Sequence, residues 1–285
     1  MNKLVLILAI ILIAGCTGNN HTESQPNQGI IIKSLEIKPS EVVDIEPFDL
    51  LFEVTNVGGK KTTVNAYIYG PSWISDTDGN LGGHELIAPD KQVGSIGESF
   101  IYTETYEPPV SVTKGLTQEY IVNGRICYPY TTSAVADVEI ISIAEKRITE
   151  VKQATKTVKT QNSDAPIRIE FTIKEPLIDY GNGQEIPIAV KIRDVGGGFA
   201  ATSTAGCKKN PALDVMNKLD VTLTGEGINT CVGEDLHLIN GETTLFCKIV
   251  ATTEGVPSKN VKLIAEATYN YYKTKTTTVK ISGIS

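Results

Sequence analysis

The sequence is poor in the residues that metal centres and enzyme active sites use most often. Its 285 residues include three His, two Met and one Trp, and the five Cys form no Cys-x-x-Cys pair. Lys and Arg number 26 against 33 Asp and Glu, which gives a net charge of −7, and they form no basic block. Nucleic-acid binding needs clustered Lys and Arg to neutralise phosphates, so this composition argues against nucleic acid as a partner.

Motifs of nucleophilic and metal-dependent catalysis are also missing. The chain has neither G-x-S-x-G nor H-E-x-x-H. The Gly196-Gly197-Gly198 run lies in a β pattern, whereas a phosphate-binding loop would follow a strand and open a helix. We therefore expect no catalytic residues and a protein that is not an enzyme, with an envelope hydrolase as the remote alternative.

The N-terminus has the features of an export signal. Lys3 supplies a positive start, and the apolar run Leu4–Ala14 is too short to span a bilayer, which needs about 20 residues. The following Ile13-Ala14-Gly15-Cys16 resembles the lipobox of secreted lipoproteins. That resemblance implies removal of residues 1–15 as a signal peptide, lipid on the thiol of Cys16 and a membrane-anchored protein that faces outward. The alternative is an ordinary or uncleaved signal in which Cys16 is incidental.

Beyond Cys16, the chain changes from a polar segment to a β-rich pattern. Residues 16–29 contain almost nothing to bury, which is typical of a flexible tether. After them, apolar residues alternate with period two and Val, Ile, Thr and Tyr are frequent, without a convincing amphipathic helix in the first half. The pattern predicts an all-β fold, with first-half strands at residues 30–37, 48–54, 64–69, 100–106, 119–130 and 134–143.

The second half of the chain repeats the order of these segments. Phe48–Gly59 lines up with Ile186–Gly197 at an offset of 138 residues, and Tyr128-Pro-Tyr130 lines up with Tyr269-Asn-Tyr271 at an offset of 141. A repeat of this length indicates a duplicated unit. We therefore predict two tandem β-sandwiches, at residues 30–144 and 167–285, joined by a linker at residues 145–166.

Each copy contains a strand that ends in Asn or Asp followed by glycines, as in Val54-Thr-Asn-Val-Gly-Gly59 and Ile192-Arg-Asp-Val-Gly-Gly-Gly198. Asn and Asp cap their own turns and Gly accepts positive φ, so a sharp reversal is expected. This pattern resembles the CARDB and other immunoglobulin-like modules of archaeal and bacterial surface proteins. The second copy also resembles uncharacterised surface proteins of small-genome archaea. The matching segments are Asp164-Ala-Pro166, Val195–Gly198, Cys207, Cys231, Leu238–Glu242 and Phe246-Cys247.

With Cys16 assigned to lipid, four cysteines remain, and they allow three complete pairings. We predict a disulfide between Cys231 and Cys247, because a loop of 16 residues separates them and closing it contributes about 3 kcal/mol. Cys207 is the alternative partner of Cys231. The side chain of Cys127 is expected to point away from the strand face that carries the tyrosines. The family that this chain resembles often has a second Cys on the following strand, where Glu139 stands here, so we predict an unpaired Cys127.

A weak calcium candidate lies in Asp76-Thr-Asp78-Gly-Asn80 followed by Glu85. These side chains fall at ligand positions 3, 5, 7 and 12 of an EF-hand loop, but Ile74 replaces the first acid. A polar turn between strands explains the same residues, so we predict no metal and no other cofactor.

Trp73 follows a predicted strand. An exposed tryptophan at a loop tip would be an interaction site, whereas a packed one would close the end of the sandwich.

The sequence therefore predicts a lipid-anchored surface protein without catalytic activity. Its immunoglobulin-like domains would serve in adhesion or in protein–protein interaction within the envelope. The alternative is a lipid-anchored subunit that recognises a glycan or a solute for a larger complex. In both cases the partners are the membrane, through Cys16, and unidentified surface proteins or glycans.

Overall fold

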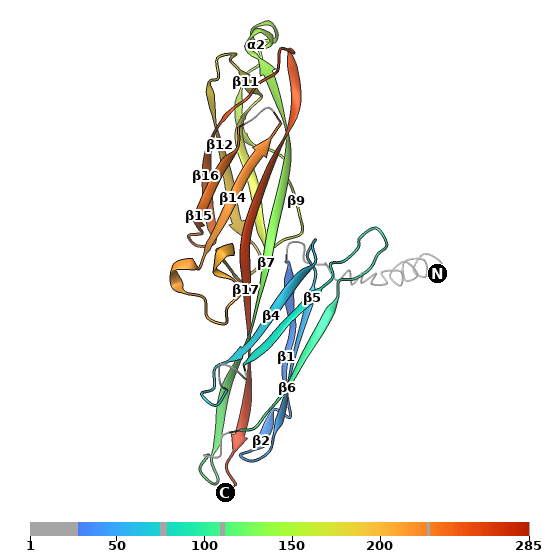
Figure 1. Ribbon diagram of the computed structural model, residues 1–285, viewed down its shortest axis with the longest axis vertical. Coiled ribbons are helices and arrows are strands. Elements are labelled where there is room, and N and C mark those ends of the chain that lie inside the picture. The colour runs from blue at the N-terminus through green and yellow to red at the C-terminus, as the bar shows by residue number, and fades with distance from the viewer. Residues whose placement is uncertain (1–27, 75–78, 109–111, 227–228, 285) are drawn as a thin grey trace, which may run out of the picture.

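The computed structural model describes residues 28–74, 79–108, 112–226 and 229–284, and it is an all-β protein. The described helical segments are α2 (Ile143–Thr149) and the short 3-10 helices η2 (Ser203–Ala205) and η3 (Leu213–Val215). The strands form sheets that pack face to face in two β-sandwich lobes, placed end to end along the molecule (Figure 1).

The strands of the first repeat are β1 (Ile30–Lys38), β2 (Glu41–Val43), β3 (Phe48–Asn56), β4 (Thr62–Tyr69), β5 (Asn80–Leu86), β6 (Ser99–Tyr106) and β7 (Thr117–Ser142). Four of these seven strands, β1, β3, β4 and β6, agree closely with the sequence prediction, whereas β2 and β5 were not predicted. Burial alternates along β3, where Phe48, Leu50, Phe52 and Val54 face the core. This is the period-two pattern expected of a strand that is buried on one face.

The second repeat contains the same succession with an insertion. Its strands are β10 (Ile167–Glu175), β11 (Leu177–Asp179), β12 (Glu185–Asp194), β13 (Phe199–Ala201), β14 (Lys218–Gly225), β15 (Cys231–His237), β16 (Glu242–Val250) and β17 (Ser258–Ser282). The insertion comprises residues 199–217 and contains β13, η2 and η3.

Two very long strands run through both lobes. β7 has 26 residues and β17 has 25, and they pair antiparallel from Thr117↔Ser282 to Ile141↔Ser258. At a rise of about 3.3 Å per residue, this ladder is about 80 Å long. Figure 1 shows the green and red strands side by side along almost the whole molecule.

Each lobe contains strand segments from both repeats. In the first lobe, the sheet β1-β3-β6 faces β5, β4, the N-terminal half of β7 and the C-terminal half of β17. In the second lobe, the sheet β16-β12-β10-β8 faces β15, β14, the N-terminal half of β17 and the C-terminal half of β7. The repeats have thus exchanged the ends of their last strands. Their division at residue 144 does not separate the two sandwiches.

The same exchange appears in two short parallel pairings. In the first lobe, β2 pairs with the end of β17, from Glu41↔Lys280 to Val43↔Ser282. In the second lobe, β11 pairs with the end of β7, from Leu177↔Ile140 to Asp179↔Ser142. A short strand of each repeat therefore pairs with the long strand of the other repeat, as expected for a duplicated unit.

The predicted break in β7 is wrong. The sequence favoured strands at 119–130 and 134–143, but the structure has one strand through both. Residues Thr131-Thr132-Ser133 contain no Gly or Pro and pair opposite Glu266, Ala267 and Thr268 of β17. Because Thr favours extended backbone and a partner strand is present, nothing interrupts the ladder.

The segment predicted as a linker, residues 145–166, contributes to the sheets. The segment begins within α2. The N-terminus of this helix is capped by the hydroxyl of Ser142, which accepts a hydrogen bond from the Glu145 N–H at 3.1 Å. Strand β8 (Ala154–Thr157) then pairs with β10, and β9 (Gln161–Asn162) pairs with β7. The connection is therefore built into the second lobe.

Candidate functional site: the waist between the lobes

Four tyrosines occupy the point where β7 and β17 pass from one lobe to the other, which we call the waist. Tyr128 lies opposite Tyr271, and Tyr130 lies opposite Tyr269. Three are fully buried and Tyr130 is 5% exposed. Their rings contact one another, with centroid separations of 5.8 Å for Tyr128–Tyr271 and 6.4 Å for Tyr130–Tyr269. The tyrosine motif that the two repeats share thus forms a single aromatic cluster between the lobes.

The Asn-Val-Gly and Asp-Val-Gly turns rest against this cluster. Asn56 Oδ1 accepts a hydrogen bond from the Gly58 N–H at 2.9 Å, and Asp194 Oδ1 accepts one from the Gly196 N–H at 2.9 Å, as the sequence predicts for self-capped turns. In the first turn, the N–H of Gly59 then donates a hydrogen bond to the Tyr130 hydroxyl.

The second turn repeats the arrangement. The Gly198 N–H donates to the Tyr271 hydroxyl at 2.8 Å, and that hydroxyl donates to Asp194 Oδ1 at 2.6 Å. Burial raises the pKa of Asp194, although the hydrogen bonds from Tyr271 and Gly196 act in the opposite direction. Nearby, burial lowers the pKa of the Lys273 ammonium to about 8. The hydrogen bonds of Tyr271 and Asp194 hold the second turn against the waist. The duplicated motif therefore has a structural explanation.

Gly58→Ala should destabilise the protein, whereas Gly59→Ala should not. A Cβ at Gly58 would lie 2.4 Å from the Tyr130 hydroxyl and 2.8 Å from the Gly29 backbone, but at Gly59 the nearest atom is 3.5 Å away. Overpacking of this kind costs about 1–3 kcal/mol. Chemical denaturation of both variants measures the difference, and equal midpoints would contradict this account of the turn.

The insertion of residues 199–217 packs on the outer face of the waist. Cys127, from β7, forms a disulfide with Cys207, with Cα atoms 5.4 Å apart. A second, smaller core of Tyr67, Cys127, Ala201 and Tyr272 lies beneath the insertion. The prediction that Cys127 is unpaired is wrong, and so is the alternative pairing of Cys207 with Cys231. The outward direction of Cys127 is as predicted, but the covering insertion supplies its partner.

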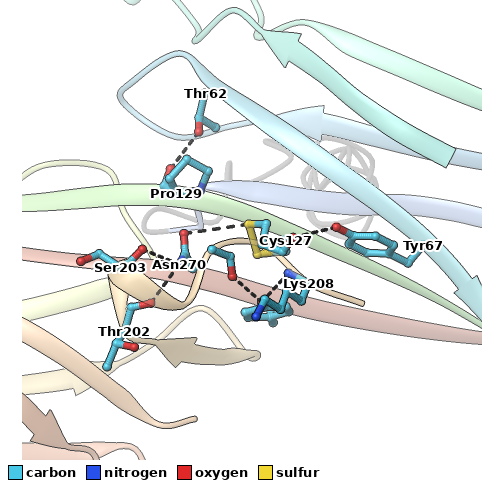
Figure 2. The surroundings of a disulfide bond; sticks show 11 residues. Thr62, Tyr67, Cys127, Pro129, Thr202, Ser203, Lys208 and Asn270 are labelled. Carbon is cyan, nitrogen blue, oxygen red and sulfur yellow. Dashed lines mark hydrogen bonds between the residues drawn. A yellow bond between two sulfur atoms is a disulfide. The ribbon is translucent and has the colours of Figure 1, made fainter. Parts of the chain in front are cut away.

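Hydrogen bonds hold the insertion around this disulfide (Figure 2). The Tyr67 hydroxyl donates to the Cys207 carbonyl at 2.9 Å, and the Asn270 amide donates to the carbonyls of Thr202 and Ser203 at 2.9 and 3.1 Å. The Lys208 N–H donates to the Tyr272 hydroxyl at 3.1 Å. The insertion therefore binds to strands of both repeats.

The second disulfide joins Cys231 of β15 to Cys247 of β16, with Cα atoms 5.9 Å apart. It is the pairing that the short intervening loop favours. Because β15 and β16 belong to opposite sheets, this bond ties the two sheets of the second lobe together.

Arg125 fastens the middle of the insertion. Its guanidinium donates to the Lys209 carbonyl and to the Tyr69 hydroxyl, both at 2.7 Å, and lies 4.7 Å from the centroid of the Tyr69 ring. These contacts use the guanidinium donors within the fold, so Arg125 has a structural role.

Next to the insertion, the outer face has an open hollow of about 370 Å³. It lies across β4, β7 and β17, and hydroxyl and cationic side chains are prominent in its lining, which includes Lys60, Lys61, Thr63, Thr131 and Thr268. Most of its exposed lining surface nevertheless belongs to apolar atoms, including those of Pro129 and the neighbouring tyrosines. Such a surface offers hydrogen bonds to a hydroxylated ligand.

Trp73 is a packing residue. Its ring lies 5.8 Å from Phe48, 6.3 Å from Tyr106 and 6.0 Å from Tyr120, measured between centroids, and it packs against the core of the first lobe. The structure thus favours the rim interpretation over an exposed aromatic anchor.

The calcium candidate is only partly placed. Asp76 and Asp78 lie outside the described residues. Asn80 Oδ1 accepts a hydrogen bond from the Gly82 N–H at 3.1 Å, and Glu85 is ion-paired with Lys61 at 3.4 Å. Across the described residues, no group of three or more His, Cys, Asp or Glu is arranged to hold a metal ion.

Cys16 and the signal segment also lie outside the described residues, so lipid attachment stays a prediction. None of the helices between residues 28 and 284 that the structure describes has the length and apolar character needed to cross a bilayer. Structural disulfides such as the two found here are typical of proteins in oxidising compartments outside the cytosol.

No protein-family model matches the chain, and no curated protein matches it. Solved structures similar to it include red sea bream transglutaminase (9% identity, TM-score 0.19) and Escherichia coli alpha-2-macroglobulin activated by porcine elastase (10%, 0.20). They cover 87% and 85% of this chain, which spans 31% and 33% of theirs. Collagen adhesin from S. aureus is also similar (10%, 0.15), with 88% of this chain and 92% of that chain covered. At these TM-scores none bears on function, and the β-sandwich fold is established by the chain's own strand ladders.

Proposed function

We propose that this protein is a non-enzymatic surface lipoprotein that displays two immunoglobulin-like lobes as one stiff unit. The observation that carries the proposal is the uninterrupted pairing of β7 with β17 through both lobes. Two separate domains on a linker would move independently, but 25 consecutive residue pairs leave no hinge between these lobes. The unit is thus suited to hold a contact surface at a fixed distance from its point of attachment.

The disulfide between Cys127 and Cys207 supports this role. It fixes the insertion over the point where the long strands leave one lobe and enter the other. A structural disulfide at this position stiffens the waist and suits an oxidising environment.

The proposed attachment is lipid on Cys16, which lies 12 residues before Gln28, where the described chain begins. A segment of that length spans at most about 40 Å when extended. Anchoring at Cys16 would therefore keep the lobes close to the membrane surface and exposed on its outer side, in position for adhesion or for contact with envelope proteins.

Mass spectrometry of the mature N-terminus, isolated from membranes of cells that produce the protein, tests the anchor. We expect the chain to begin at Cys16 with the added mass of its lipid, and membrane-impermeant biotinylation of intact cells to label exposed lysines such as Lys248. Cys16→Ser should abolish the lipid mass, while Cys127→Ser should leave it unchanged. An unmodified Cys16 would refute the anchor, and absence of surface labelling would refute display.

The open hollow at the waist supports a second candidate function, the recognition of glycans. Its lining of Thr and Lys side chains can donate hydrogen bonds to sugar hydroxyls. A glycan array probed with the mature chain tests this function. Binding that Thr131→Val and Thr268→Val weaken would support it, whereas uniform absence of binding would count against it.

A further inference from the structure

The two repeats differ at one sheet edge. β1 and β10 hold the same place in their repeats, since each pairs antiparallel with the strand that precedes the Gly-rich turn. In the second lobe, β8 covers the other edge of β10, from Thr172↔Thr157 to Glu175↔Ala154. No strand among the described residues covers the corresponding edge of β1, so its sheet has three strands instead of four.

In the second lobe, the segment 154–162 forms hydrogen bonds with the backbone N–H and C=O groups along the outer edge of β10. The Val158 N–H donates to the Phe171 carbonyl at 3.0 Å. The Asn162 amide then binds both backbone groups of Ile169, accepting from its N–H at 2.8 Å and donating to its carbonyl at 2.9 Å. The side chain of Val158 is only 7% exposed, so the segment also contributes an apolar residue to the core.

The equivalent edge of β1 can be located from the strand register. Leu35 pairs with Phe52 as Phe171 pairs with Val190, and Phe52 and Val190 are equivalent in the two repeats. Leu35 therefore corresponds to Phe171, and the β1 edge from Leu35 to Lys38 is equivalent to Phe171–Lys174. Pro39, which follows β1 and has no N–H, stands where Glu175 ends the β8 site. Backbone N–H and C=O groups along such an edge are a template for another strand.

A lysine occupies part of the space that the segment 154–162 fills in the second lobe. The Lys275 Nζ donates to the Lys33 carbonyl at 2.9 Å, at the bulge in β1. Its equivalent on β7, at the offset of the tyrosine motif, is Ala134, which is fully buried and pairs with Asn162 of β9. Lys275 thus caps one carbonyl and blunts the edge, as lysines on natural edge strands do.

We propose that the edge Leu35–Lys38 is a docking site for an extended segment of a partner protein, which adds antiparallel to β1 and displaces Lys275. By analogy with β8, the partner strand would carry Thr or Lys on its outward face and one β-branched aliphatic residue, equivalent to Val158, directed inward. This inference rests on the proposed interaction role and is independent of lipid attachment at Cys16.

The sequence of the chain's own tether does not match this requirement. By its spacing from β1, the segment equivalent to β8 and β9 is Thr17–Gln25, which reads TGNNHTESQ. It contains Gly18, Asn19 and Asn20, which are residue types depleted in strands, and His21 stands where Val158 would be. A strand from another protein therefore suits the edge better.

A synthetic peptide of residues 153–163, QATKTVKTQNS, is a defined probe for this edge. We expect the labelled peptide to bind the mature chain in fluorescence anisotropy, and Lys275→Ala to tighten binding about fivefold, since it removes a competing hydrogen bond. Lys262→Ala is the matched control, because Lys262 is an ion-paired lysine on the second-lobe half of the same strand. Absence of binding to both the wild-type chain and Lys275→Ala would overturn the proposal.

Cross-linking tests the register. In the second lobe the hydroxyls of Thr157 and Thr172 are 3.4 Å apart, and Glu36 is the β1 equivalent of Thr172. A peptide with Thr157→Cys should form a disulfide with Glu36→Cys at least about tenfold faster than with Thr103→Cys, on the opposite edge strand β6. Equal rates would contradict the site.

A variant with both Asn20→Cys and Glu36→Cys tests whether the chain's own tether, and not a partner protein, occupies the β1 edge. Asn20 is the position in the tether equivalent to Thr157. If this variant forms an internal disulfide quantitatively and excludes the peptide, the tether covers the edge and the partner proposal is wrong. If the peptide still cross-links to Glu36→Cys in a chain that keeps its tether, the proposal is supported.

Discussion

The protein should unfold abruptly when the pH is raised above 10, because burial raises the pKa of many of its tyrosine hydroxyls. Burial raises the pKa of Tyr102 to about 12 and those of the waist tyrosines above the ordinary value. Seven tyrosines share this property: Tyr67, Tyr102, Tyr128, Tyr130, Tyr269, Tyr271 and Tyr272.

The direction of the effect follows from proton binding. Above pH 10 these tyrosines ionise in the unfolded chain but stay protonated in the folded one, so the folded state binds more protons and the free energy of unfolding falls as the pH rises. Each contributes about 1.4 kcal/mol per pH unit, and a typical domain is stable by about 5–15 kcal/mol. The midpoint of the transition should therefore lie at about pH 11. Lys273 opposes this trend between its folded pKa of about 8 and its ordinary value of 10.5, but it is one group against seven.

Tyrosinate absorbance at 295 nm and far-ultraviolet circular dichroism, recorded on the same samples, measure this transition. The absorbance of the buried tyrosines should appear only as the β signal is lost. Tyr102→Phe, which removes one of the seven groups, should make the transition shallower by about one proton. Full tyrosine ionisation near pH 10 with an intact β signal would show that the hydroxyls are open to solvent and would contradict the buried waist.

Removal of the Cys127–Cys207 disulfide should cost more stability than removal of the Cys231–Cys247 disulfide. The first closes a loop of 80 residues and the second a loop of 16. In the chain-entropy model these loops contribute about 4.5 and about 3 kcal/mol. The difference should increase further, because Cys127 also belongs to the small core beneath the insertion.

The comparison requires two double variants, Cys127→Ala with Cys207→Ala and Cys231→Ala with Cys247→Ala, unfolded in guanidinium chloride. Limited proteolysis supplies a local readout. Loss of the first disulfide should make residues 199–217 the earliest cleavage site, whereas loss of the second should leave them protected. A larger stability loss from the second pair, or unchanged protection of the insertion in the first, would show that the waist disulfide does not hold the insertion in place.

How well the sequence predicted the structure depended on the range of the interaction concerned. Strands β1, β3, β4 and β6 were identified from period-two patterns, and the turns after Asn56 and Asp194 from residues that cap themselves. These features depend on neighbouring residues alone. The break in β7 was wrong because a partner strand overrides a weak local signal at Thr131–Ser133.

The candidate site was less accessible from the sequence. The outward direction of Cys127 was correct, but the prediction that it is unpaired was wrong. Its partner lies in the insertion after Gly198, whose path across the waist depends on contacts with Tyr67 and Tyr272, far away in sequence. Pairing by loop length alone favours close cysteines, so it identified Cys231–Cys247 and missed Cys127–Cys207.

The sequence by itself determined that the chain is β-rich, duplicated and poor in catalytic motifs, because composition, period and repeats are local or internal properties; the export signal at its N-terminus is still a prediction. Only the tertiary structure decided that β7 and β17 form one ladder, that each lobe uses strand segments from both repeats, and that β8 covers an edge that no strand among residues 28–284 of the described chain covers on β1. The physical reason is that strand pairing joins backbone groups far apart in the chain, and backbone groups have no sequence signature of their own.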